Sequence, residues 1–136
     1  MNYLLDTNVV SEIQRKRPNR RVTTWMENTD PASLYISVLT LGEIAKGAAR
    51  VARSDVAQAA VLEQWLDATR LQFVNRIIAV DAEISMTWGR LNANRPLPVV
   101  DSLLAATALV RDMILVTRDT RDILDTGVRT INPWMA

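Results

Sequence analysis

Short apolar runs alternate with helix-forming segments along the whole chain, and this alternation limits the folds open to it. We expect strands at 3–5, 34–36, 77–80 and 113–116, with an edge strand at 128–131. We expect helices at 9–16, at 22–28, after Ser37, after Ser54, after Asp81 and at 99–111. Helices between strands favour a mainly parallel sheet covered on both faces. The length is that of one domain, which we expect to span 1–136.

The segment 99–111 is apolar on almost every side, as in a helix buried over most of its surface. Its first turn nevertheless carries Asp101, followed three, four and seven residues later by Leu104, Ala105 and Ala108. A carboxylate is favoured at a helix start because of the partial positive charge there. The sequence leaves two interpretations open, a plain helix-start acid or a ligand for a metal ion.

Histidine and cysteine are both absent from the sequence. Their absence excludes a Ser-His-Asp triad, a histidine-pair ribonuclease, imidazole or thiolate metal sites, and disulfides. Any hydrolytic chemistry must therefore use carboxylates. The formal net charge of +1 shows that the chain as a whole is no polycation. No apolar run reaches the roughly 18 residues that span a bilayer, so we expect no membrane partner and a cytoplasmic location.

Acids at strand ends are the first candidates for a site, because active sites of open α/β sheets lie beyond the carboxyl ends of the strands. Asp6 ends the first expected strand, and Asp119 lies three residues after the fourth. Asp6 is alternatively a helix N-cap, and Asp122 competes with Asp119 because one turn carries both. Glu43 is weaker from the residues alone, since a helical wheel places it beside Lys46, as for a solvated residue.

Five short motifs stand in an order that resembles the VapC-like PIN nucleases. They are Leu4-Leu5-Asp6-Thr7-Asn8, Leu41-Gly42-Glu43-Ile44, the stretch 98–108, the stretch 116–122, and Gly127-Val128 with Ile131-Asn132-Pro133-Trp134. The resemblance spans the chain and implies a PIN-like α/β/α sandwich with a mainly parallel central sheet. Carried across residue by residue, it implies that the catalytic, metal-holding acids are Asp6, Glu43, Asp101 and Asp119, with Asp122 as a reserve ligand.

The resemblance also implies an activity, that of a Mg²⁺-dependent endoribonuclease acting as the toxin of a type II toxin–antitoxin pair. Mg²⁺ prefers carboxylate oxygens, Mn²⁺ could replace it, and Asp6 and Asp101 would hold the main ion. The implied substrate is RNA, with tRNA as one candidate, cleaved to leave a 5′-phosphate and a 3′-hydroxyl. The implied partners are a small cognate antitoxin protein and a second copy of the chain in a homodimer.

Two further sets of residues are candidates for supporting roles. Asn8 and Thr117 are placed to orient the carboxylates by hydrogen bonding, or they are ordinary turn residues. The densest basic stretch is Arg15 to Arg21, within which Arg17, Arg20 and Arg21 are the candidate contacts for RNA phosphates. A charge run between helices is alternatively a solvated surface.

Other interpretations of the same residues remain open at this point. A haloacid-dehalogenase-type phosphatase needs a second Asp two residues after the first, where this chain has Asn8. A receiver-like signalling domain needs a Lys after a late strand, and the last lysine is Lys46. A PIN fold that only binds is a third alternative. Trp25, Met26 and Trp65 are expected in the core; if partly exposed, they would form a hydrophobic groove for the antitoxin.

Overall fold

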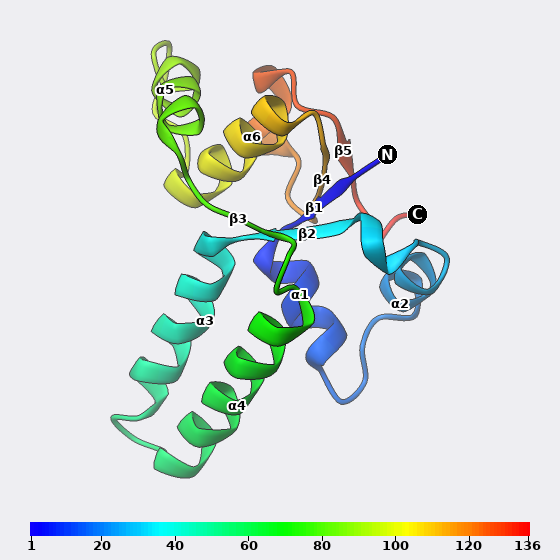
Figure 1. The fold of residues 1–136 in the computed structure, drawn as a ribbon, viewed down its shortest axis with the longest axis vertical. Coiled ribbons are helices and arrows are strands. Elements are labelled where there is room, and N and C mark those ends of the chain that lie inside the picture. Colours follow the sequence, from blue (N-terminus) through cyan, green and yellow to red (C-terminus); the bar gives the residue numbers. More distant parts are fainter.

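A five-stranded sheet lies at the centre of the computed structural model, which describes residues 1–136 (Figure 1). The strands are β1 (Tyr3–Leu5), β2 (Leu34–Ser37), β3 (Ile77–Ile78), β4 (Ile114–Val116) and β5 (Thr130–Ile131). Their order is β3-β2-β1-β4-β5, and every neighbouring pair is parallel. The predicted α/β architecture is confirmed. The first strand of the sequence is the central strand of the sheet. The residue that follows it, Asp6, therefore lies at the middle of the carboxyl edge of the sheet.

Helices connect the strands and cover both faces of the sheet (Figure 1). They are α1 (Thr7–Gln14), α2 (Arg20–Glu27), α3 (Val38–Val51), α4 (Val56–Gln72), α5 (Ala82–Leu91) and α6 (Val99–Arg111), with short 3₁₀ helices η1 (Pro31–Ser33) and η2 (Arg121–Thr126). The α3 and α4 helices form a hairpin that extends away from the sheet (Figure 1). None of these helices combines the length and apolar character needed to cross a membrane.

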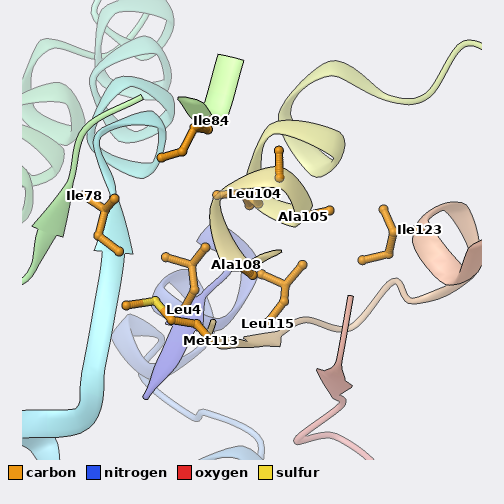
Figure 2. Packing of buried hydrophobic residues seen from close by; sticks show 10 residues of the cluster. Leu4, Ile78, Ile84, Leu104, Ala105, Ala108, Met113, Leu115 and Ile123 are labelled. Atoms are coloured by element: carbon orange, nitrogen blue, oxygen red, sulfur yellow. The ribbon is translucent and has the colours of Figure 1, made fainter. Parts of the chain in front are cut away.

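Successive residues of β1 point to opposite faces of the sheet and divide the core in two. Leu4 pairs in register with Leu115 of β4, and both belong to the cluster that packs under α5 and α6. Leu5 pairs with Val116, and both belong to the cluster on the face that carries α1 and α2. Figure 2 shows the first cluster, in which side chains of α6 meet Leu4 and Leu115. The helix at 99–111 is buried on the sheet as predicted.

The predicted bounds of several elements were wrong at their ends. The first helix begins at residue 7 instead of 9 and ends at 14 instead of 16. The strands β3 and β5 are two residues long, although four were expected for each. Both lie at the edges of the sheet and pair on one side only, so fewer hydrogen bonds extend them.

The start of α2 also differs from the prediction, by two residues. The break between the first two helices was expected to include Arg20 and Arg21, but α2 begins at Arg20. The cause is Asn19, whose side-chain oxygen accepts hydrogen bonds from the backbone amides of Arg21 (2.9 Å) and Val22 (3.3 Å). The two arginines therefore lie in the first turn of a helix, on a fixed backbone.

Candidate active site

Asp6 leaves the central strand at the carboxyl edge of the sheet, and its side chain does not cap the helix that follows. It occupies the N-cap position of α1, yet it makes no side-chain capping hydrogen bond. Instead the Thr117 hydroxyl, just beyond β4, donates to Asp6 Oδ2 over 2.7 Å. Both residues are buried, with Asp6 5% exposed. Asp6 thus occupies the N-cap position without a side-chain capping hydrogen bond, and Thr117 holds one carboxylate oxygen in place.

The electrostatics of Asp6 reflect this buried position. Burial raises the pKa of the Asp6 carboxyl above its usual range, while the hydrogen bond from Thr117 and the backbone amide of Asn8 oppose the rise. The negative charge of Glu43 raises the pKa of Asp6 further. A buried carboxylate with a second acid nearby is a site that a cation would stabilise.

Glu43 is half-buried, although the helical wheel suggested a solvated residue. Its negative charge acts on both Asp6 and Asp101. The Thr7 hydroxyl donates to Glu43 Oε1 over 2.5 Å, and Thr7 Oγ1 lies 3.0 Å from the hydroxyl of Thr40. A hydroxyl has one proton, and that of Thr7 goes to Glu43, so Thr40 is the donor to Thr7. Thr40 is fully buried in α3. Two threonines from separate elements therefore fix Glu43 beside the end of β1.

Asp101 is the residue at which the charges of the site converge. Burial raises the pKa of the Asp101 carboxyl to about 6, and so do the neighbouring charges, in decreasing order, of Asp6, Asp119, Asp122 and Glu43. Asp101 lies in the first turn of α6 and is partly buried. Asp119 and Asp122, also partly buried, come from the segment that follows β4. All the predicted acids are thus brought to one edge of the sheet, and Asp119 acts on Asp101 more strongly than Asp122 does.

The donor set fits a hard divalent cation. Every ligating group at this edge is a carboxylate oxygen, and mutual repulsion among the acids is the kind of strain that a bound cation relieves. No three of these side chains stand close enough together to enclose an ion by themselves. Mg²⁺ usually keeps several waters and uses one or two carboxylates, so a pair such as Asp6 and Asp101 with water is the appropriate arrangement.

The side chains of the remaining predicted residues do not contact the acids. Asn8 is exposed, and its side chain donates to none of the acids; it lines a shallow hollow along α1. Arg20 and Arg21 line a different hollow together with Tyr3, the first residue of β1. Arg17 is exposed between α1 and α2 and forms no ion pair. The structure does not bring the basic residues at 17, 20 and 21 to the acids.

Two supporting residues, Thr7 and Thr40, were missed as such from the sequence. One signal was available for Thr40, because it precedes Glu43 by three residues and so shares its side of α3. No pattern in the sequence indicates that Thr7 reaches across from α1.

The profile of the PIN domain family matches residues 3–127. Toxin FitB of Neisseria gonorrhoeae is 30% identical over 96% of this chain and 97% of its own length. The VapC ribonuclease Y4jK of Sinorhizobium fredii is 28% identical over 96% of each chain. In the crystal structure of FitAcB from Neisseria gonorrhoeae, one chain superposes with a TM-score of 0.89 at 28% identity, covering 98% of this chain and 99% of that one.

Proposed function

The chain belongs to the PIN domain family, and from this premise we propose that it is a metal-dependent endoribonuclease, the toxin of a toxin–antitoxin pair. Relatives that align over nearly its whole length are named a toxin and a ribonuclease. The observation that carries the proposal is the gathering of carboxylates from separate segments around Asp101. Family membership removes the phosphatase and receiver alternatives and leaves a binding-only PIN domain as the rival.

Asp6 and Asp101 are the proposed ligands of Mg²⁺, or of Mn²⁺ in its place. Glu43 and Asp119 complete the acid set through direct or water-mediated contacts, with Asp122 in reserve. A bound divalent ion at such a site polarises a phosphate and lowers the pKa of a water molecule. RNA is the proposed substrate, with tRNA as one candidate. The proposed products carry a 5′-phosphate and a 3′-hydroxyl.

The chain's own residues supply positioning and charge. Thr117 holds Asp6 Oδ2 and leaves the rest of that carboxylate to a ligand. Thr7 donates to Glu43 Oε1 at the edge of the same site, and Thr40 contacts the Thr7 hydroxyl. Because the pKa of Asp101 stands near 6 without a cation, a fraction of Asp101 retains its proton just below neutral pH. Binding of a cation favours release of that proton.

A cognate antitoxin and a second copy of the chain are the proposed protein partners, acting with the enzyme in the cytoplasm. Support for the antitoxin comes from the relative named as a toxin, Toxin FitB. The predicted groove residues Trp25, Met26 and Trp65 are each only partly buried, and all three pack on the core cluster beneath α1. Their side chains pack in the core, and the part of each that stays exposed gives an apolar surface for a partner segment. Light scattering of the purified chain would test the dimer directly.

The test is cleavage of RNA by the purified protein with Mg²⁺, with Mn²⁺ and with EDTA. We expect cleavage with either metal and none in EDTA. The chain has no histidine or cysteine, so the proposed activation of water depends on the metal that the carboxylates hold. Asp6→Ala should lower the rate of RNA cleavage by more than ~10–100-fold, which is the typical cost of losing a residue that only hydrogen-bonds to a metal ligand. The matched control is Asp67→Ala, at an exposed acid on α4, which should behave as wild type.

Two outcomes would contradict the proposal. Cleavage that persists in EDTA, or equal activity of Asp6→Ala, would exclude the metal mechanism at this edge of the sheet. RNA binding without cleavage in either metal would favour the binding-only domain.

A further inference from the structure

Arg118 stands between two residues of the acid site, yet it neutralises none of the acids. Its neighbour Thr117 holds Asp6, and its neighbour Asp119 acts on Asp101. Arg118 is exposed and takes part in none of the four ion pairs of the structure. A cation that remains unpaired next to several carboxylates is available to an anion that approaches from outside.

The position of Arg118 is built by the motif Asn132-Pro133-Trp134. Its guanidinium carbon lies 5.0 Å from the centre of the Trp134 ring, a distance typical of a cation–π contact. Asn132 ties the two residues together, because its Nδ2 donates to the Arg118 carbonyl (3.2 Å) and its Oδ1 accepts from the Trp134 amide (3.0 Å). An arginine held on an aromatic face loses less freedom when it binds a phosphate than a free one does.

Hollows open on both sides of Arg118. One, of about 340 Å³, is lined by Asn8, Ser11, Glu12, Arg15, Arg118 and Trp134. The other, of about 490 Å³, is lined by Arg118, Asp119, Thr120, Arg121, Asn132 and Met135. The first hollow follows one side of α1 away from the acid site. Its residues 8, 11, 12 and 15 are spaced three or four positions apart, and such residues share one side of a helix. The two hollows together border the site near Asp6 and at Asp119.

The charges of this surface suit a polyanion. Arg118 and Arg121 are cations without an ion pair along it, while Arg15 offsets the charge of Glu12. The one acid outside the catalytic set, Glu12, is already engaged by the backbone amide of Asn19 (2.9 Å) and by Arg15 (3.4 Å). Trp134 is only partly buried and adds an aromatic face. Basic grooves with aromatic faces are typical of single-strand binding.

We propose that these two hollows form the track for single-stranded RNA, in which Arg118, supported by Trp134, binds a phosphate next to the one that is cleaved. The inference rests on the proposed nuclease function. It adds that the RNA is single-stranded where it binds, and it names the residues that position it. Arg118 binds the RNA backbone, and Trp134 and Asn132 act through Arg118.

The test measures binding of a short fluorescein-labelled single-stranded RNA to the non-cleaving Asp101→Asn protein in Mg²⁺, across a salt series. Adding Arg118→Ala should weaken binding roughly tenfold and reduce the salt slope by about 0.7 for the lost phosphate contact. Trp134→Ala should weaken binding in the same direction, and Trp134→Phe, which keeps an aromatic face, should restore most of it. Thermal melts establish that each variant is folded. The matched control is Arg70→Ala, at an exposed arginine on α4 that forms no ion pair, which should leave affinity and slope unchanged.

Steady-state cleavage gives a second readout in the otherwise unaltered protein. Arg118→Ala should raise KM for single-stranded RNA about tenfold while kcat changes much less, as expected for a group that binds substrate and transition state alike. Unchanged KM and unchanged salt slope in a protein that still cleaves RNA with metal would overturn this inference and leave the proposed function standing. Loss of antitoxin binding with RNA binding intact would overturn it too and assign the surface to a protein partner. Failure of the unaltered protein to cleave any RNA would instead remove the proposed function, and the inference with it.

Discussion

The two ends of strand β1 differ in the side chains that surround them. At the carboxyl end, Asp6 is buried and makes no side-chain capping hydrogen bond, and the neighbouring acids raise the pKa of Asp6 and of Asp101. At the amino end, Tyr3 packs edge-on against Trp25, with ring centres 5.3 Å apart, beside a hollow of about 550 Å³ lined also by Arg20 and Arg21. The larger hollow is therefore at the end without the acids.

Side-chain chemistry, more than the size of a cavity, therefore locates this site. The carboxyl end concentrates like charges that oppose folding in the absence of a cation. The amino end has an aromatic contact and exposed cations that water can screen. Variants at the two ends should accordingly change RNA cleavage and stability to different extents.

The largest effect is expected when Asp6 loses its partner. Thr117→Val removes the hydroxyl that donates to Asp6 Oδ2 and keeps a similar shape. The carboxylate then loses both an orienting group and an interaction that lowers its pKa, so we expect a roughly 10–100-fold loss of RNA cleavage at saturating metal. Thr117→Ser restores a hydroxyl and should recover most of the activity. Equal rates for the valine and serine variants would show that this hydrogen bond has no part in catalysis.

The sequence predicted the acids of the site better than it predicted how they are held. Asp6 and Asp101 were identifiable because a strand end and an apolar helix face each made an acid conspicuous. Glu43 was found only by resemblance, since its place depends on a contact from Thr7 that joins positions 36 apart in sequence. Helical periodicity describes one helix and contains no information about such cross-element hydrogen bonds.

The limits of the prediction were similar in the fold. The alternation of strands and helices predicted the parallel sheet, and the near-uniform apolarity of 99–111 predicted the buried helix with the right bounds. The short edge strands β3 and β5 were overestimated because sequence patterns do not show which strands pair on one side only. The start of α2 was missed because the capping side chain of Asn19 lies within a run of basic residues.

A smaller effect, on stability, is expected from Asp101→Asn in the metal-free protein. The pKa of the Asp101 carboxyl is raised from 3.8 to about 6 on folding, so the folded state binds this proton more tightly than the unfolded state. The stability that the group contributes is complete below pH 4 and is lost as the pH rises through 6. Asn has no charge to repel. The variant should match wild type near pH 4 and exceed it by about 1 kcal/mol at pH 7, given that Asp101 is partly exposed and partly screened.

Chemical denaturation of both proteins at a series of pH values, after removal of metal, measures this difference. Added Mg²⁺ should narrow or reverse it, because wild type gains stability by binding the ion in its folded state and the variant gains much less. The variant should also be inactive, so that function and stability change in opposite directions. A variant that is less stable than wild type at pH 7, with both proteins equally stabilised by Mg²⁺, would identify Asp101 as a structural helix-start acid.

The smallest effect is expected at the amino end of β1, from Arg20→Ala combined with Arg21→Ala. Both arginines lie beside Tyr3, whereas Asp6 follows the last residue of the same three-residue strand, so about 10 Å of strand separates the two places. A short single-stranded RNA that spans the acid site has no need to reach them. We therefore expect unchanged cleavage and an unchanged salt slope of binding with such an RNA, measured beside Arg118→Ala. A slope lowered by about 0.7 for each arginine removed would show instead that both ends of β1 contact the RNA, and that the basic cluster belongs to the substrate path.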